Sequence, residues 1–266
     1  MNKVIFLKLG GSLITEKDEP ATPRVDVITR IAEEIAEARV ADPEMTLLLG
    51  HGSGSFGHVP ASKYGTRQGV RTPEQWIGFA EVWRDAAALN RIMMDALFAT
   101  GLPAIAFPPS SSAVARDGEI ARWEIGPIEA ALQGNLLPVI YGDTLIDEIR
   151  GGMILSTEEL FRFLAKGLKP QRILIAGMEP GIYSDFPDKH DLIQSITTKT
   201  YASVTSKLQG SADIDTTGGM SSKVQLMINI IEELRACKVS IFSGHEPGNI
   251  LRALAGERLG TQVIYS

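Results

Sequence analysis

The clearest pattern along the chain is a series of short apolar runs separated by longer amphipathic stretches. The runs cover residues 3–10, 45–50, 103–107, 137–143, 172–177, 239–244 and 261–266. Most of them are continuous rather than alternating in polarity, which is typical of strands buried on both faces of a parallel sheet.

The stretches between these runs have the apolar spacing of helices, most clearly in residues 25–40, 73–99, 156–168 and 220–237. Strands that alternate with helices predict a three-layer αβα sandwich with a mainly parallel central sheet. Asp117-Gly118 stands between short strand-like segments and predicts a β-hairpin appended to this sheet. The polar stretch 183–191 predicts a loop.

The chain has no internal repeat, low-complexity tract or obvious linker. Its 266 residues therefore predict a single domain over residues 1–266, with any division into two lobes near residues 165–172.

Charge and composition narrow the classes of partner. A net charge of −6, without a basic stripe, argues against a nucleic-acid partner. The single cysteine, Cys237, permits no internal disulfide and suits a reducing cytoplasm. The apolar run at the N-terminus is short and interrupted by Lys8, so we expect neither a signal peptide nor a membrane span.

The first candidate for chemistry is the turn Gly10-Gly11-Ser12, which ends the first predicted strand between Lys8 and Lys17. Two glycines allow a polyphosphate to approach the backbone N–H groups closely. Two lysines neutralise charge that moves during phosphoryl transfer. An ordinary turn with two surface lysines is the alternative, and no P-loop pattern is present.

The second candidate is the loop after the second predicted strand, where Gly52, Gly54 and Gly57 spell G-x-G-x-x-G. A dinucleotide fold places this fingerprint on its first strand–helix turn, which here is the Gly10-Gly11 turn instead. The loop is better interpreted as an anion cradle that ends on His58, a residue able to donate a hydrogen bond to a phosphate or carboxylate. A purely structural histidine remains the alternative.

The third candidate is the segment 213–223, in which glycines precede a strongly helical run and Lys223 falls in its first turn. Free N–H groups and the helix dipole at such a terminus favour a phosphate. A capped loop without a ligand explains the same residues.

Together these segments resemble the amino acid kinase family, and within it the branch that phosphorylates isopentenyl phosphate. The resemblance covers essentially the whole chain in order. It rests on K-x-G-G-S-x-I-T-x-K at 8–17, G-S-F-G-H at 54–58, Y-G-D at 141–143, D-x-T-G-G-M-x-x-K at 215–223, and P-G-N-I-x-x-A-L-x-G…G-T from 247 to 261. The histidine-terminated loop is its most specific element.

This resemblance implies an ATP-dependent phosphotransferase that uses Mg²⁺ and converts isopentenyl phosphate into isopentenyl diphosphate. It implies an acceptor-substrate lobe (residues 1–168), a nucleotide lobe (169–266) and a homodimer. The implied nucleotide-binding residues are Lys8, Gly10, Gly11, Ser12, Gly54, Gly177, Gly219 and Lys223. The implied substrate-binding residues are Ser53, Gly54, His58 and Thr157, and the implied catalytic residues are Lys8, Lys17, His58 and Glu158.

Physical chemistry is consistent with these roles. An alkyl monophosphate is largely dianionic near neutrality, because its second pKa is about 6. It needs alignment and relief from anion repulsion more than it needs a general base. His58 is therefore expected to position the acceptor phosphate rather than to remove a proton.

Two segments depart from the family pattern. Ser156-Thr157-Glu158 replaces S-G-D, so a longer acidic side chain must orient the lysines, and Thr157 brings a side chain where an amide usually faces the substrate. The segment 177–181 replaces T-D-V-D-G, which bears on the adenine and ribose contacts.

Two other functions compete with this one. One is a phosphonate kinase of the fosfomycin-phosphorylating kind, or another small alkyl-phosphate kinase. The other is a non-catalytic protein on the same fold that binds a nucleotide or oxyanion. An apolar acceptor pocket would favour the isoprenoid substrate, and the helix around residues 76–83 has the residues to supply one.

Overall fold

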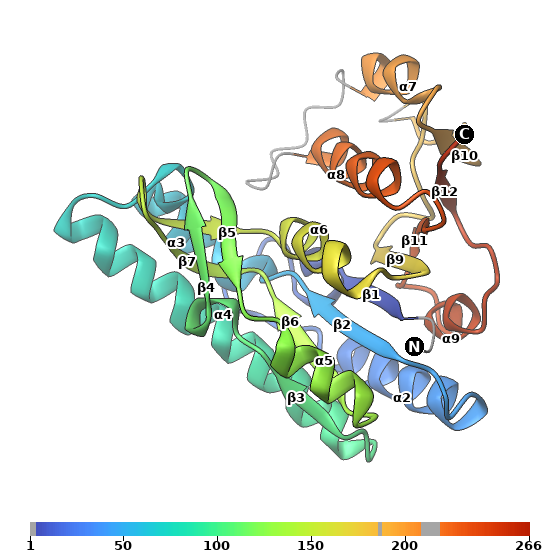
Figure 1. Ribbon diagram of the computed structural model, residues 1–266, viewed down its shortest axis with the longest axis horizontal. Coiled ribbons are helices and arrows are strands. Elements are labelled where there is room, and N and C mark those ends of the chain that lie inside the picture. Colours follow the sequence, from blue (N-terminus) through green and yellow to red (C-terminus); the bar gives the residue numbers. More distant parts are fainter. Residues whose placement is uncertain (1–3, 186–187, 209–218) are drawn as a thin grey trace.

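An eight-stranded, mostly parallel sheet forms the centre of the molecule (Figure 1). The computed structural model describes residues 4–185, 188–208 and 219–266, without the side chains of 58–59, 205–208 and 219–221. The sheet has the strand order β10-β12-β11-β9-β1-β2-β6-β3. Its strands are β1 (Ile5–Leu9), β2 (Leu47–His51), β3 (Ala104–Ala106), β6 (Leu137–Tyr141), β9 (Arg172–Gly177), β10 (Ser195–Thr197), β11 (Lys238–Ser243) and β12 (Thr261–Ile264). Only the β11–β12 pairing in this sheet is antiparallel.

Helices cover both faces of this sheet and enclose two apolar cores. One core holds residues of α1 (Gly11–Ile14), α2 (Val25–Ala41), α4 (Pro73–Ala99) and α9 (Asn249–Leu254). The other holds residues of α5 (Gly126–Gln133), α6 (Thr157–Leu168) and α8 (Gly219–Glu233). This arrangement confirms the expected three-layer sandwich.

The alternation of side chains along the central strands decides which layer each polar residue meets. In β1, Phe6 faces the core beneath α6, while Leu7 and Leu9 face the opposite core. Lys8 therefore points toward α6. By the same alternation in β2, His51 points toward α4.

The predicted hairpin is present, but it lies in a separate four-stranded sheet with the order β5-β4-β7-β8. Asp117 and Gly118 form its turn with φ of 50° and 91°, as a tight hairpin turn requires. The run 137–143, expected as one strand, ends at Tyr141, and Asp143 opens a new strand. The strands of the second sheet are β4 (Ala113–Arg116), β5 (Glu119–Trp123), β7 (Asp143–Asp147) and β8 (Gly151–Leu155).

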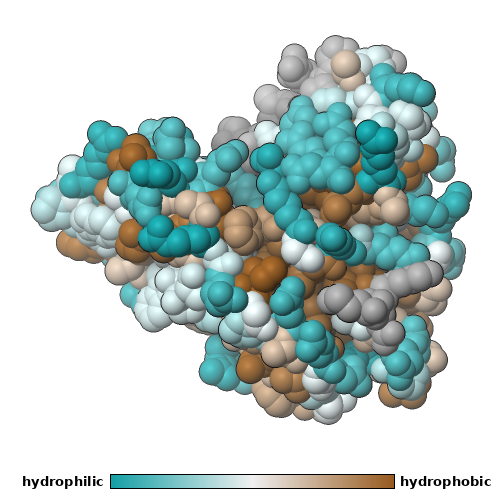
Figure 2. Space-filling view, in the orientation of Figure 1, coloured by the Kyte–Doolittle hydropathy of each residue, from teal (hydrophilic) through white to brown (hydrophobic). Residues whose placement is uncertain are grey.

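The remaining described helices are α3 (Gly54–Tyr64), α7 (Tyr201–Leu208), and the 3₁₀ turns η1 (Thr66–Gln68) and η2 (Pro109–Ser111). No helix in the described part of the chain combines the length and apolar character needed to cross a membrane. On the face shown in Figure 2, hydrophilic residues are spread among smaller hydrophobic patches.

Candidate active site

Two glycine loops meet backbone to backbone at the carboxyl ends of the neighbouring strands β1 and β2. A Cβ atom added to Gly11 would lie 2.5 Å from the nitrogen of Gly54, and one added to Gly52 would lie 2.9 Å from the nitrogen of Gly11. These are closer than real side-chain contacts, so the approach of the two loops requires glycine.

Thr15 joins the two loops. Its hydroxyl donates to the Gly11 carbonyl at 2.9 Å and accepts from the Ser55 amide at 3.0 Å. Gly54 has a φ of +50°, and a Cβ there would lie 2.1 Å from Thr15 Oγ1. The first two predicted motifs are thus parts of one structure.

The carboxyl end of β9 lies beside those of β1 and β2 and completes this edge of the central sheet. The Gly10 amide donates to the Ala176 carbonyl at 2.8 Å, and Gly177 lies directly beside Gly10. Among the described residues, none accepts a hydrogen bond from the amides at positions 11, 12, 53 and 54. Backbone N–H groups that lack an internal acceptor are available to an anion.

Lys8 and Glu158 form a buried ion pair beneath these loops. Lys8 Nζ donates to Glu158 Oε1 at 2.9 Å, and the side chains are only 7% and 4% exposed. Burial disfavours the Glu158 carboxylate, but the charges of Lys8 and Lys223 and the hydrogen bond from Lys8 outweigh it and lower its pKa. Glu158 is therefore held ionised by the positive charges of two lysines of the predicted site, of which Lys8 is in direct contact.

The start of α6 places Glu158 there. Ser156 and Glu159 form a reciprocal capping box, which puts Thr157 and Glu158 in the first turn. Thr157 is buried, and its hydroxyl donates to the His51 carbonyl at 2.6 Å. Its side chain thus joins α6 to the end of β2.

The other predicted site residues lie at different depths. Ser12 is exposed in the first loop, Lys17 is exposed beyond it, and Ser53 is the half-buried N-cap of α3. Gly177 borders open space, and Gly219 begins α8. His58 lies on α3, but its side chain is outside the description, as are residues 213–218 of the third motif.

Comparison with known proteins identifies the family. The family model described as "Amino acid kinase family" matches residues 3–243. The chain belongs to the amino acid kinase family. It is 34% identical to the isopentenyl phosphate kinases of Methanothermobacter thermautotrophicus and Methanocaldococcus jannaschii, with 98% of each chain covered. A solved isopentenyl phosphate kinase structure superposes with a TM-score of 0.82 at 31% identity, covering 98% of this chain and 99% of the other.

Sequence reasoning missed several polar residues beneath this amino acid kinase site. His51 and Asn90 are buried and face each other across β2 and α4. Asp143 is fully buried and accepts a hydrogen bond from the Ser110 amide at 3.1 Å, and burial raises its pKa. For Asp143 the signal in the sequence is the Y-G-D motif at 141–143, to which no role was assigned; for His51 and Asn90 it is only that a polar residue adjoins apolar ones.

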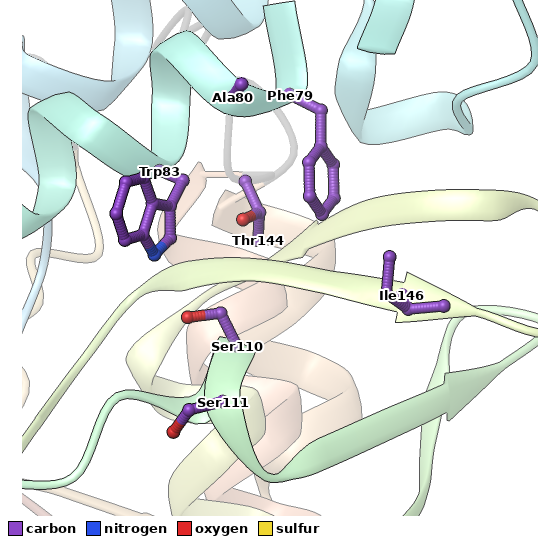
Figure 3. A pocket seen from close by; sticks show the side chains of 7 residues that line it. All are labelled: Phe79, Ala80, Trp83, Ser110, Ser111, Thr144 and Ile146. Carbon is purple, nitrogen blue, oxygen red and sulfur yellow. The ribbon is translucent and has the colours of Figure 1, made fainter.

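An apolar pocket lies between α4 on one side and η2 and β7 on the other (Figure 3). Its volume is about 390 Å³, and its lining consists of Phe79, Ala80, Trp83, Ser110, Ser111, Thr144 and Ile146. The helix expected to supply an apolar pocket does so through Phe79 and Trp83. Thr144 Oγ1 is buried without a hydrogen-bond partner in the described structure.

Proposed function

We propose that this protein is an ATP-dependent kinase that phosphorylates isopentenyl phosphate to isopentenyl diphosphate. The observation that carries the proposal is the buried Lys8–Glu158 pair beneath two interlocked glycine loops. The full-length similarity to isopentenyl phosphate kinases supports the choice of substrate.

Each loop has a distinct role in this proposal. Lys8 and the Gly10–Ser12 turn hold the β- and γ-phosphates of MgATP, and Lys17 stabilises the transferring phosphoryl group. On the acceptor side, the phosphate is bound by Ser53, Gly54 and His58. Gly177, Gly219 and Lys223 complete the nucleotide side, where Gly54 also contributes.

Transfer then depends on alignment and charge. The acceptor phosphate is already a nucleophile near neutrality, so no group has to remove its proton. Amides of the two loops and the lysines offset the repulsion between the acceptor and the γ-phosphate. Glu158 keeps Lys8 in place and balances part of the positive charge when the site is empty.

The pocket favours an acceptor with a short apolar tail. The Gly142 amide donates to the His51 carbonyl at 3.0 Å, which ties the start of β7 to the edge that holds the glycine loops. A tail in the pocket would lie against Phe79, Trp83 and Ile146. Burial of a five-carbon tail favours binding by about 0.8 kcal/mol per CH₂ group, which a smaller phosphonate gains only in part.

We also propose a division of the chain into two lobes, an oligomeric state and a cellular compartment. The acceptor lobe comprises residues 1–168 and the nucleotide lobe residues 169–266, with β1 between β2 of the first and β9 of the second. Phosphoryl transfer then takes place where the lobes join. We further propose a homodimer that works in the cytoplasm.

The test is ATP turnover with a panel of acceptors: isopentenyl phosphate, dimethylallyl phosphate, fosfomycin, glutamate, aspartate and carbamate. We expect turnover of isopentenyl phosphate with the highest kcat/KM. Preferred turnover of fosfomycin would support the phosphonate kinase, and tight ATP binding without any turnover would support the non-catalytic protein.

His58→Ala tests the acceptor loop in the same assay. We expect kcat/KM for the acceptor to fall by about 10²-fold while the Kd for ATP stays unchanged, because His58 contacts only the acceptor phosphate. His190→Ala is the matched control, since its ring is 84% exposed in the 188–191 loop. Unchanged turnover in His58→Ala would refute this assignment.

A further inference from the structure

His51 is a buried histidine at the end of β2, directly before the second glycine loop. Its ring is fully buried and stacks on Tyr141, with ring centroids 5.5 Å apart and 16° between the planes. Nδ1 lies 3.0 Å from the Gly52 carbonyl oxygen, and Nε2 lies 3.2 Å from the side-chain amide of Asn90 at Oδ1. Both ring nitrogens are therefore engaged.

The surroundings of the ring favour its neutral form. Burial lowers the pKa of His51, and the nearby charge of Lys8 acts in the same direction, against two hydrogen bonds that favour the charged form. A carbonyl only accepts hydrogen bonds, so in the neutral ring Nδ1 carries the hydrogen that goes to Gly52. Nε2 then accepts from the NH₂ group of Asn90, which requires the side-chain amide to be turned by 180° so that its nitrogen takes the position of Oδ1.

The bond to Gly52 has a consequence for the next amide. The peptide unit that joins Gly52 to Ser53 is planar and trans, so its C=O and N–H groups point in opposite directions. Since the carbonyl points into the core toward His51, the Ser53 N–H points away from it. This N–H donates to no acceptor within the described residues.

We propose that His51 is a positioning residue: its Nδ1–H group fixes the Gly52 carbonyl and thereby directs the Ser53 amide toward the bound phosphate. The inference rests on the proposed function, because it assigns the Gly52–Gly54 loop to phosphate binding. Asn90 has a supporting role, since it engages the other ring nitrogen and helps to hold the ring in place.

Two substitutions by amide side chains, each of which keeps one of the two polar contacts, separate this role from simple packing. In His51→Asn the amide nitrogen replaces Nδ1, so the bond to Gly52 is retained and the contact with Asn90 is lost. In His51→Gln the side-chain amide reaches the position of Nε2, where its oxygen accepts from the Asn90 NH₂ group, so the contact with Asn90 is retained and the bond to Gly52 is lost. Both variants remove the stacking on Tyr141, so we expect similar decreases in Tm.

The measurements are Tm, kcat, KM for isopentenyl phosphate and Kd for ATP. We expect His51→Asn to keep kcat within about threefold of wild type, and His51→Gln to lose about 10- to 100-fold. Equal losses of kcat in the two variants, or a larger loss in His51→Asn, would overturn the proposal.

Asn90→Leu provides a second comparison if His51→Gln does not fold. It removes the partner of Nε2 and leaves the bond to Gly52, so kcat should stay within about threefold even if Tm falls. A large loss of kcat in either His51→Asn or Asn90→Leu would then overturn the proposal, and its retention in both would support it.

Measuring the turnover of isopentenyl phosphate by the wild-type protein distinguishes a failure of this proposal from a failure of the proposed function. If the wild-type protein does not phosphorylate isopentenyl phosphate, the proposed function fails. The His51 variants are then compared through the Kd for ATP, because the Gly52–Gly54 loop packs on the Gly10–Ser12 loop. A weaker Kd in His51→Gln alone would support the positioning role, and equal values would refute it.

Discussion

Lys8 and Glu158 are 150 residues apart in the chain, yet their charged groups lie 2.9 Å apart in the interior, at the carboxyl end of β1. Glu158 has one methylene more than the aspartate of the related S-G-D pattern, and its longer side chain still reaches the lysine. Replacing one residue of such a buried ion pair by a neutral one leaves the other residue's charge buried without its partner.

Replacing Glu158 by Gln should therefore destabilise the protein and weaken catalysis. We expect a loss of about 3–5 kcal/mol in the free energy of unfolding, because Lys8 stays buried without a counter-charge. We also expect kcat to fall by about 10²-fold. Glu158→Asp is the control: it keeps the charge, so it should recover part of both losses. Equal losses of unfolding free energy and kcat in the two variants would show that the negative charge at position 158 does not determine either.

Lys17 should act on the rate rather than on stability. Its side chain is exposed, so Lys17→Ala should leave Tm within about 1 °C of wild type. We expect kcat to fall by about 10²-fold with little change in the Kd for ATP, because the proposed contact forms mainly in the transition state. The exposed Lys199 provides the matched control. A parallel loss of ATP affinity in Lys17→Ala would place this residue in ground-state binding instead.

The contact between the glycine loops makes a prediction about Gly54. Gly54 and Gly65 both have positive φ, +50° and +62°, but a Cβ at Gly54 would collide with Thr15 Oγ1, whereas a Cβ at Gly65 meets nothing within 4 Å. Gly65→Ala should cost only the backbone strain of about 1–2 kcal/mol. Gly54→Ala should cost clearly more and abolish turnover. Similar unfolding curves for the two variants would contradict the close packing of the loops.

Asp147 should make the second sheet sensitive to acid. Burial disfavours its carboxylate, but four backbone N–H groups, those of Asp117, Gly118, Ile149 and Arg150, donate to it and lower its pKa. A carboxylate whose pKa is lower in the folded state stabilises the protein when the pH is above its unfolded-state pKa of about 3.9. This stabilisation disappears as the pH falls through the folded-state pKa.

Asp147→Asn should accordingly cost about 2 kcal/mol at neutral pH, and its Tm deficit should shrink below about pH 4. Thermal unfolding between pH 2 and pH 7 measures this difference. Asp95→Asn, at a largely exposed site on α4, should show no such pH dependence. A Tm deficit of Asp147→Asn that stayed constant with pH would rule out the charged form as the cause.

The sequence predicted the parts of the fold that depend on local patterns. Continuous apolar runs located seven of the eight central strands, and helical spacing located α2, α4, α6 and α8. The strand β10 and the helix α7 were missed because they are short and polar. The strands β7 and β8 were missed because glycines and acidic residues interrupt the stretch 143–155.

For the site, too, local patterns predicted some features, whereas others depend on how distant segments come together. The glycine loops and lysines could be identified from their spacing, but their assembly requires the order β9-β1-β2 in the sheet. The family resemblance suggested Glu158 as the partner of the lysines, and the structure shows its contact with Lys8. The relation of His51 to Asn90 was out of reach, since no local pattern links residues 39 positions apart.

The placement of the pocket has a consequence for evolution. The loops proposed to carry the phosphates belong to the eight-stranded sheet, whereas the pocket is built from α4, η2 and β7 of the second sheet. Substitutions at Phe79, Trp83 or Ile146 can therefore reshape the pocket without touching the backbone of the glycine loops. A change of acceptor then requires substitutions only on α4 and in the second sheet, while the transfer machinery at the edge of the eight-stranded sheet stays the same.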